Sequence, residues 1–105
     1  MKTINAADFK AQYTPEFVIV DVREPREYVD GHVPGAVLIP LAQLPIRKAE
    51  VPNDGPVYVI CHSGNRSKVG ASVLEAAGYD AISVNGGTQA WIIQGGPVVT
   101  GREPR

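Results

Sequence analysis

The sequence lacks the features that staple or anchor many small proteins. It has one cysteine, which excludes an internal disulfide, a CxxC redox pair and a thiolate-rich zinc site. No stretch is long and apolar enough to span a bilayer. The N-terminus has no apolar segment of the kind found in signal peptides. We therefore expect a cytoplasmic protein that has no membrane partner.

The sequence also lacks an excess of charge of either sign. Ten Lys and Arg residues against eleven Asp and Glu residues give a formal net charge of −1 at pH 7, so nothing favours nucleic acid as a partner. The 105 residues suit one domain over residues 1–105, large enough to bury a core unaided. The single thiol is then an inert core group, an intermolecular link or a nucleophile.

Runs of β-branched and aromatic residues alternate with helical patterns along the chain. The predicted strands are residues 3–4 at a sheet edge, 17–22, 37–39, 57–60 and 81–84. The predicted helices are residues 6–13 capped by Asn5, 25–30, a broken helix over 41–50 interrupted at Pro45, 67–77 and 88–94. From Gly95 the tail looks loosely held. Strands alternating with helices at short spacing indicate an α/β fold with a parallel sheet.

The one cysteine stands between a predicted buried strand and a polar turn. Cys61 opens the sequence Cys-His-Ser-Gly-Asn-Arg-Ser over residues 61–67, and ligands of open parallel sheets bind beyond such strand ends. Residues 63–65 can form a nest of inward-facing N–H groups. Arg66 adds a permanent positive charge, and Ser67 can cap the next helix. These surroundings favour thiolate over thiol and stabilise a thiolate, a persulfide or an oxyanion.

The length of this loop separates sulfur chemistry from phosphate chemistry. Cysteine phosphatases carry the pattern His-Cys-x5-Arg, whereas this chain reads Cys-x4-Arg with Ile60 in place of the histidine. A shorter loop should close more tightly around a single sulfur atom than around a phosphoryl group. The spacing therefore favours sulfur chemistry over phosphate-ester hydrolysis.

One carboxylate interrupts an apolar strand and needs a partner. Asp21 should pair either with Arg66 across the strand ends or with the N–H groups of the turn that begins at Arg23. We interpret Asp21 as a residue that orients the site rather than one that reacts.

The two histidines carry weaker predictions. His62 could supply a local positive charge or a proton, or could simply point to solvent. His32, in a His-Val-Pro-Gly turn, is more typical of a structural hydrogen-bonding residue. His32, Cys61 and His62 lack the close spacing of known metal ligands, so no metal site is expected.

Three separated motifs follow one another along the chain. The first is Asp21-Val22-Arg23 with Glu-Tyr-Val-Asp-Gly-His-Val-Pro-Gly-Ala over residues 27–36, the second is the loop over 61–67, and the third is Gly78-Tyr79, Val84-Asn85-Gly86-Gly87 and Trp91 with Gly96-Pro97. Together they resemble the single-domain rhodaneses, a family of sulfurtransferases. The match covers about residues 5–97 and leaves residues 98–105 as a tail. It is specific because all three motifs occur together and in the right order.

The resemblance implies a three-layer α/β/α fold with five parallel strands in the order 3-2-4-5-1. It also implies that the Cys61 thiolate takes the outer sulfur of thiosulfate, or of another sulfane donor, and becomes a persulfide. Cyanide or a thiol, including a thiol of an acceptor protein, then takes that sulfur. The resemblance assigns donor or persulfide binding to the residues that follow the cysteine: His62, Ser63, Gly64, Asn65, Arg66 and Ser67. It implies neither a metal nor an organic cofactor.

Two functions remain open at this point. The chain can be an active thiosulfate sulfurtransferase, or a persulfide carrier or regulatory protein-binding module that receives its sulfur from a partner. The intact Cys61 argues against a purely structural copy of the domain, but it does not separate enzyme from carrier.

Overall fold

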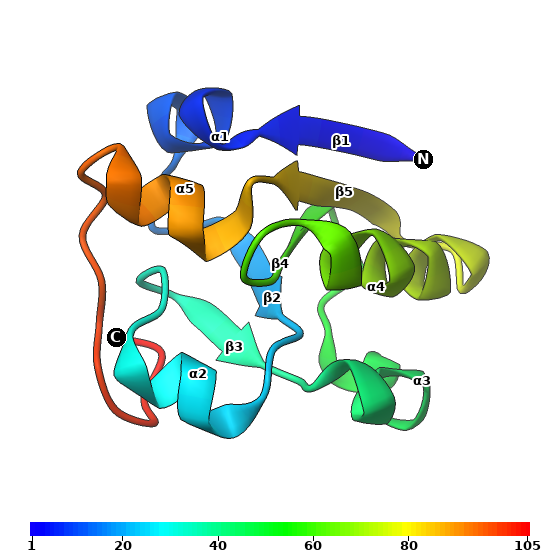
Figure 1. Ribbon diagram of the computed structural model, residues 1–105. Coiled ribbons are helices and arrows are strands. Elements are labelled where there is room, and N and C mark those ends of the chain that lie inside the picture. The colour runs from blue at the N-terminus through cyan, green and yellow to red at the C-terminus, as the bar shows by residue number, and fades with distance from the viewer.

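A five-stranded parallel sheet runs through the centre of the computed structural model, which describes residues 1–105 (Figure 1). Its strands are β1 (Lys2–Asn5), β2 (Val18–Asp21), β3 (Ala36–Leu38), β4 (Pro56–Ile60) and β5 (Asp80–Asn85). They lie in the order β1-β5-β4-β2-β3, and all four neighbouring pairs are parallel. This is the predicted order read from the other edge, so the fold prediction is confirmed.

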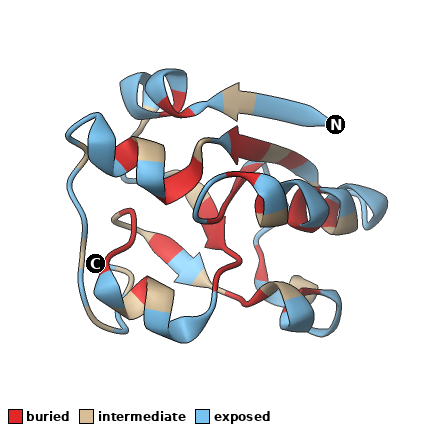
Figure 2. Ribbon diagram, viewed as in Figure 1, coloured by how far each residue is buried: buried red, intermediate tan, exposed pale blue.

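Helices cover both faces of the sheet. One face carries α1 (Ala6–Gln12), α2 (Pro25–Asp30) and α5 (Gly87–Ile93), and the other carries α3 (Leu44–Arg47) and α4 (Asn65–Ala76). Alternate side chains of a strand point to opposite faces. The core is accordingly divided into two buried clusters, one on each face of the sheet. Figure 2 shows buried residues in red on the inner strands and on parts of the helices. None of the helices is long and apolar enough to cross a membrane.

The β4 strand shows why the cysteine belongs to one particular layer. Val57, Val59 and Cys61 pack in the cluster beneath α4, whereas Tyr58 and Ile60 pack in the cluster beneath α1 and α5. The strand predicted over residues 57–60 is confirmed, and its burial on both faces is that of a central strand in a parallel sheet.

Local sequence signals set several helix ends correctly and others wrongly. Asn5 caps α1 as predicted, because its Oδ1 accepts a hydrogen bond of 2.8 Å from the Asp8 N–H. The helix predicted from Ser67 begins instead at Asn65. The predicted broken helix consists of α3 flanked by the short 3₁₀ turns Leu41–Gln43 and Lys48–Glu50. Pro45 lies in the first turn of α3, where proline is tolerated, and does not interrupt it.

The prediction of a loosely held tail is wrong. Val99 forms an antiparallel bridge with His32, and the Gly101 N–H donates to the Val29 carbonyl at 2.9 Å. Further on, the Gly35 N–H donates to the Pro104 carbonyl at 2.9 Å. The Gly- and Pro-rich composition suggested mobility, but an extended segment can still satisfy main-chain groups left free by a distant turn. The tail therefore closes over the segment between α2 and β3.

Candidate active site

The candidate nucleophile lies where two central strands end side by side. β2 and β4 pair in register up to Asp21 and Ile60, and Cys61 is the next residue after β4. This is the carboxyl edge of the sheet, where ligands of such folds bind. The Cys61 side chain is 1% exposed, whereas its neighbours His62 and Ser63 are exposed. The sulfur therefore lies beneath the exposed residues of the loop.

A short turn directs a main-chain N–H group at the cysteine sulfur. The Gly64 N–H donates to the Cys61 Sγ atom at 3.1 Å. Gly64 has φ of +117°, which glycine adopts readily, and α4 begins at the next residue, Asn65. The first-turn N–H groups of a helix have no acceptor within the helix, and here no side chain caps them. Negative charge on sulfur is therefore stabilised at this helix end.

The start of α5 holds the loop from its other side. The Thr88 N–H donates to the Cys61 carbonyl at 2.9 Å, and the Gln89 N–H donates to the His62 carbonyl at 3.0 Å. Gly87 permits this approach, because a Cβ atom there would lie 2.5 Å from both carbonyl oxygens. The turn at Gly86 and Gly87 therefore brings the start of α5 against the main chain of the loop.

Ser67 was predicted to cap α4, but it does not. It lies inside the first turn and is fully buried, and its Oγ donates to the Gly64 carbonyl at 3.0 Å. The same Oγ lies 2.8 Å from the Ser83 Oγ on β5. The left-handed backbone of Gly64 ends the turn early, so the helix starts before the serine. Its hydroxyl fastens the loop to the sheet.

Arg66 makes a two-pronged ion pair with a residue of α2. Its two terminal nitrogens lie 2.7 and 2.9 Å from the Glu27 carboxylate oxygens. The Arg66 hydrogen bonds lower the pKa of Glu27 to about 2. The pKa of Arg66 is raised, first by the Glu27 hydrogen bonds and to a smaller extent by the charge of Cys61. The cation predicted to attract an anionic donor is thus already paired with a carboxylate.

Asp21 binds the turn at Arg23 and does not contact Arg66. Its Oδ1 accepts from the Arg23 N–H at 3.0 Å, and its Oδ2 lies 2.8 Å from an Arg23 terminal nitrogen. Both side chains are at least 95% buried, and the same nitrogen donates to the Gly31 carbonyl at 2.8 Å. Of the two predicted kinds of partner, the turn beginning at Arg23 is correct. The pair fixes the segment between β2 and α2.

The two histidines have different surroundings. His62 is exposed beside the loop. His32 is buried, stacks on Tyr28, and has its two ring nitrogens 2.8 Å from the carbonyl oxygens of Tyr28 and Glu103. The structural role predicted for His32 is confirmed. No group of three potential ligands, these histidines and Cys61 included, is arranged to hold a metal ion.

Comparison with known proteins now decides the family. The family model of the rhodanese-like domain matches residues 5–94. The chain belongs to the rhodanese-like domain family. The resemblance noted in the sequence is therefore confirmed over nearly the whole chain.

Several rhodanese relatives are similar along most of this chain. A protein named sulfurtransferase from Allochromatium vinosum is 37% identical over 87 residues, covering 82% of this chain and 81% of that protein. The Bacillus subtilis putative sulfur carrier protein YrkF is 40% identical over 74 residues, covering 70% of this chain and 40% of that protein. The crystal structure of a rhodanese-related protein from Thermoplasma volcanium has a TM-score of 0.89 and 35% identity, covering 96% and 100% of the two chains.

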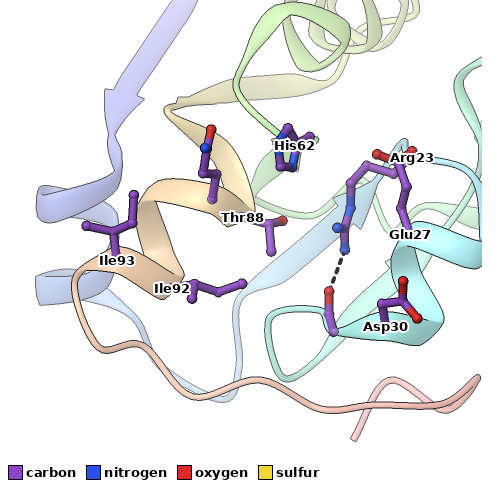
Figure 3. Close-up of a pocket in the computed structure, with 9 residues that line it drawn as sticks. Arg23, Glu27, Asp30, His62, Thr88, Ile92 and Ile93 are labelled. Atoms are coloured by element: carbon purple, nitrogen blue, oxygen red, sulfur yellow. Dashed lines mark hydrogen bonds between the residues drawn. The ribbon is translucent and has the colours of Figure 1, made fainter.

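This rhodanese-like domain also has an open groove of about 440 Å³ beside the loop (Figure 3). Its lining comes from the segments around α2, the loop and α5: Arg23, Glu27, Asp30, Gly31, His62, Thr88, Gln89, Ile92 and Ile93. The Thr88 hydroxyl is the one buried side-chain polar atom that has no hydrogen-bond partner. The loop Cys61–Ser67 was predicted, whereas this groove was not.

Three residues near the loop have side-chain surroundings that the sequence did not predict. For Arg23 the N–H group was predicted as a partner of Asp21, but its guanidinium, which also binds that carboxylate, was not. Glu27 is 39 positions from its partner Arg66, and no local pattern links them. Thr88 follows two glycines and gave no signal of an unpartnered hydroxyl.

Proposed function

We propose that this rhodanese-like protein is a sulfurtransferase that carries a sulfane sulfur as a persulfide on Cys61. The observation that carries the proposal is the Gly64 N–H directed at the Cys61 Sγ atom at the N-terminal end of α4. Donors preorganised around one sulfur stabilise a thiolate before reaction and a persulfide anion after it. Family membership and the name of the Allochromatium vinosum relative support the same function.

The first step loads the cysteine. The Cys61 thiolate attacks the outer sulfur of a sulfane donor, and the donor's sulfur–sulfur bond breaks with its electron pair on the leaving group. With thiosulfate the leaving group is sulfite. Residues His62 to Ser67 supply the loop and the first turn of α4, whose N–H groups hold the charge.

The second step unloads the cysteine. A thiophilic acceptor, cyanide or a thiolate, attacks the outer sulfur of the persulfide and forms a new bond to it. The bond between that sulfur and the Cys61 Sγ atom breaks, and its electron pair returns to Cys61 as thiolate. Covalent catalysis of this kind needs only the nucleophile and the donors that stabilise its charge.

The proposed function predicts thiocyanate formation that depends on the thiol. Wild-type protein incubated with thiosulfate and cyanide should produce thiocyanate, and Cys61→Ser should reduce the rate to background, with a thermal melt to check that the variant is folded. Wild-type turnover equal to that of the serine variant, with every sulfane donor tried, would contradict the enzyme assignment. An aryl phosphate should remain intact, since the loop fits one sulfur atom.

A persulfide carrier is the second candidate, and one observation favours it. Arg66 is held by Glu27 at 2.7 Å, which weakens its attraction for a dianion such as thiosulfate. The Bacillus subtilis relative named a putative sulfur carrier protein agrees with this alternative. Carrier function predicts slow thiosulfate turnover together with rapid loading of Cys61 by a persulfide donor, so single-turnover rates for the two donors separate the candidates.

A further inference from the structure

The groove between α2 and α5 begins beside the proposed nucleophile and is not needed by either small substrate. His62, the residue after Cys61, forms part of its lining. Figure 3 shows Thr88 and Ile92 on α5 and Asp30 on α2, on opposite sides of the groove. Thiosulfate and cyanide are small compared with its volume of about 440 Å³. The groove therefore has room for a larger group next to the reacting sulfur.

Among the charged side chains that line the groove, one carboxylate is left without a partner. Arg23 is neutralised by Asp21 at 2.8 Å, and Glu27 is neutralised by Arg66 at 2.7 Å. Asp30 is exposed and forms neither an ion pair nor a side-chain hydrogen bond. His62 is the other titratable group on the lining and has no carboxylate partner. An occupant that carries a positive charge near Asp30 is therefore complementary to the groove.

The α5 side of the groove adds apolar surface and one unsatisfied polar atom. Ile92 is 50% exposed and Ile93 is 77% exposed. The Thr88 hydroxyl, on a residue only 1% exposed, has no partner within the protein. A buried polar atom without a partner costs free energy, which a ligand recovers if it hydrogen-bonds there. A main-chain amide beside an apolar side chain supplies both contacts, as an extended peptide does.

We infer that this groove binds a cysteine-bearing segment of an acceptor protein. The segment places an apolar side chain on Ile92 and Ile93, a basic side chain near Asp30, and a main-chain amide at the Thr88 hydroxyl. The inference rests on the proposed function, because the segment's cysteine is the thiol that removes sulfur from Cys61. It names that acceptor as a basic and apolar polypeptide rather than a small free thiol.

The transfer step balances without an added oxidant or reductant. The acceptor thiolate attacks the outer sulfur of the Cys61 persulfide and forms a sulfur–sulfur bond. The bond from that sulfur to the Cys61 Sγ atom breaks, and its electron pair leaves Cys61 as thiolate. The products are the acceptor persulfide and the free thiolate of Cys61, which can be loaded again.

Single-turnover transfer to short peptides tests the charge preference. Protein loaded with one sulfur is mixed with a peptide whose cysteine is flanked by leucine and lysine, or with one in which glutamate replaces lysine. Each rate is divided by that peptide's rate with a small disulfide, which corrects for its thiolate content. The basic peptide should react about fivefold faster than the acidic one at low ionic strength, with the ratio falling as salt is added.

Matched variants assign this preference to the groove. Asp30→Asn should bring the basic-to-acidic ratio close to unity, whereas Asp54→Asn, in the exposed loop before β4, should leave the ratio unchanged. Ile93→Ser should slow transfer to the leucine-containing peptide. Ile46→Ser, at an isoleucine on α3 that is also largely exposed, should not. Equal effects of groove and control variants, or faster transfer to 2-mercaptoethanol than to the basic peptide, would overturn the inference.

The threonine hydroxyl gives an independent test. Thr88→Val removes the unpartnered hydroxyl but keeps the shape of the side chain, and should slow transfer to the basic peptide by about threefold. Thr88→Ser retains the hydroxyl and should restore most of that rate. If valine and serine variants transfer sulfur to the peptide equally fast, the hydroxyl does not bind it, and that part of the inference is wrong.

The same measurements separate failure of this inference from failure of the proposed function. If Cys61 never acquires a sulfur atom from any donor, the proposed function fails before the groove is tested. If Cys61 is loaded and gives its sulfur to cyanide but shows no preference among the peptides, the groove inference alone fails.

Discussion

The Glu27 carboxylate sets how much of the Arg66 charge an incoming donor experiences. Glu27→Gln removes the negative partner while keeping the side chain's shape, so Arg66 becomes free to attract anions. We expect kcat/KM for thiosulfate to rise by about threefold to tenfold, with little change for an uncharged persulfide donor. A fall for both donors would show instead that Glu27 is needed to position Arg66.

Arg66 itself should discriminate between donors by charge. Arg66→Ala is expected to lower kcat/KM for thiosulfate more than for an uncharged sulfane donor. Only the anionic donor is attracted by the Arg66 charge that the substitution removes. Steady-state kinetics with both donors measure the two losses. Equal losses would remove Arg66 from donor recognition and leave it a structural partner of Glu27.

The pH dependence of the Glu27–Arg66 pair follows from the direction of its pKa shift. The pKa of Glu27 is lowered from 4.5 to about 2 by Arg66, so the pair contributes stability above about pH 4.5 and loses it as the pH falls towards 2. Wild type should exceed Glu27→Gln in unfolding free energy by about 1 kcal/mol or less, since both side chains are partly exposed. Urea unfolding across pH 2 to 7 should show this gap closing only below about pH 4.5.

Individual site residues differ in how far the sequence could predict their contacts. Cys61 and its loop follow from a strand, a glycine turn and a helix pattern that are contiguous in the chain. Asp21 accepts a hydrogen bond from the N–H of Arg23, two residues away, a contact that local sequence patterns can predict. The Arg66–Glu27 contact joins residues 39 positions apart, on α4 and α2, which cover opposite faces of the sheet. Only the tertiary structure brings them together.

The contact between the start of α5 and the nucleophile loop makes Gly87 the most constrained glycine of the site. Gly87→Ala adds a Cβ atom 2.5 Å from the Cys61 carbonyl oxygen, at a left-handed φ of +58°. We expect a loss of more than about 2 kcal/mol in unfolding free energy, together with impaired loading of Cys61. Chemical denaturation measures the first effect and single-turnover kinetics the second.

Gly78 provides the matched control for that substitution. It also has a positive φ, of +93°, but a Cβ atom there would meet nothing within 4 Å. Gly78→Ala should therefore cost only the backbone strain, about 1 kcal/mol, and leave Cys61 loading unchanged. Similar losses for the two variants would contradict the steric argument for the loop.

Helix starts were predictable only where a capping signal is unambiguous. Asn5 caps α1 through its own side chain, which local sequence rules anticipate. At α4 several of the polar residues 63–67 are possible N-caps. The N-cap is Gly64, whose backbone is left-handed, and the helix begins at the next residue. That choice is fixed by contacts of the loop with β5 and α5, which a local pattern does not contain.

The C-terminal tail belongs to the folded structure of the chain. Deleting residues 98–105 removes the main-chain bonds at Val99, Gly101 and Pro104 and uncovers the buried His32 ring. We expect a loss of about 2 to 4 kcal/mol in unfolding free energy and faster hydrogen exchange in the segment between α2 and β3. An unchanged melting temperature and unchanged exchange would contradict this role.

The strand order came from the resemblance to a family and not from propensity, because periodicity identifies strands but does not say which of them are neighbours. The buried apolar runs correctly identified the central strands β2 and β4. Composition failed at the tail, whose order depends on main-chain partners more than 60 residues away. Long-range pairing is the information that local sequence rules lack.

The central claim is that Cys61 carries a transferable sulfur, and intact-protein mass measurement tests it most directly. After incubation with a persulfide donor and removal of excess reagent, the wild-type chain should gain the mass of one sulfur atom. Cyanide should then remove that mass and release thiocyanate, and Cys61→Ser should gain nothing. No added sulfur on the wild type, or equal addition to the serine variant, would contradict the account.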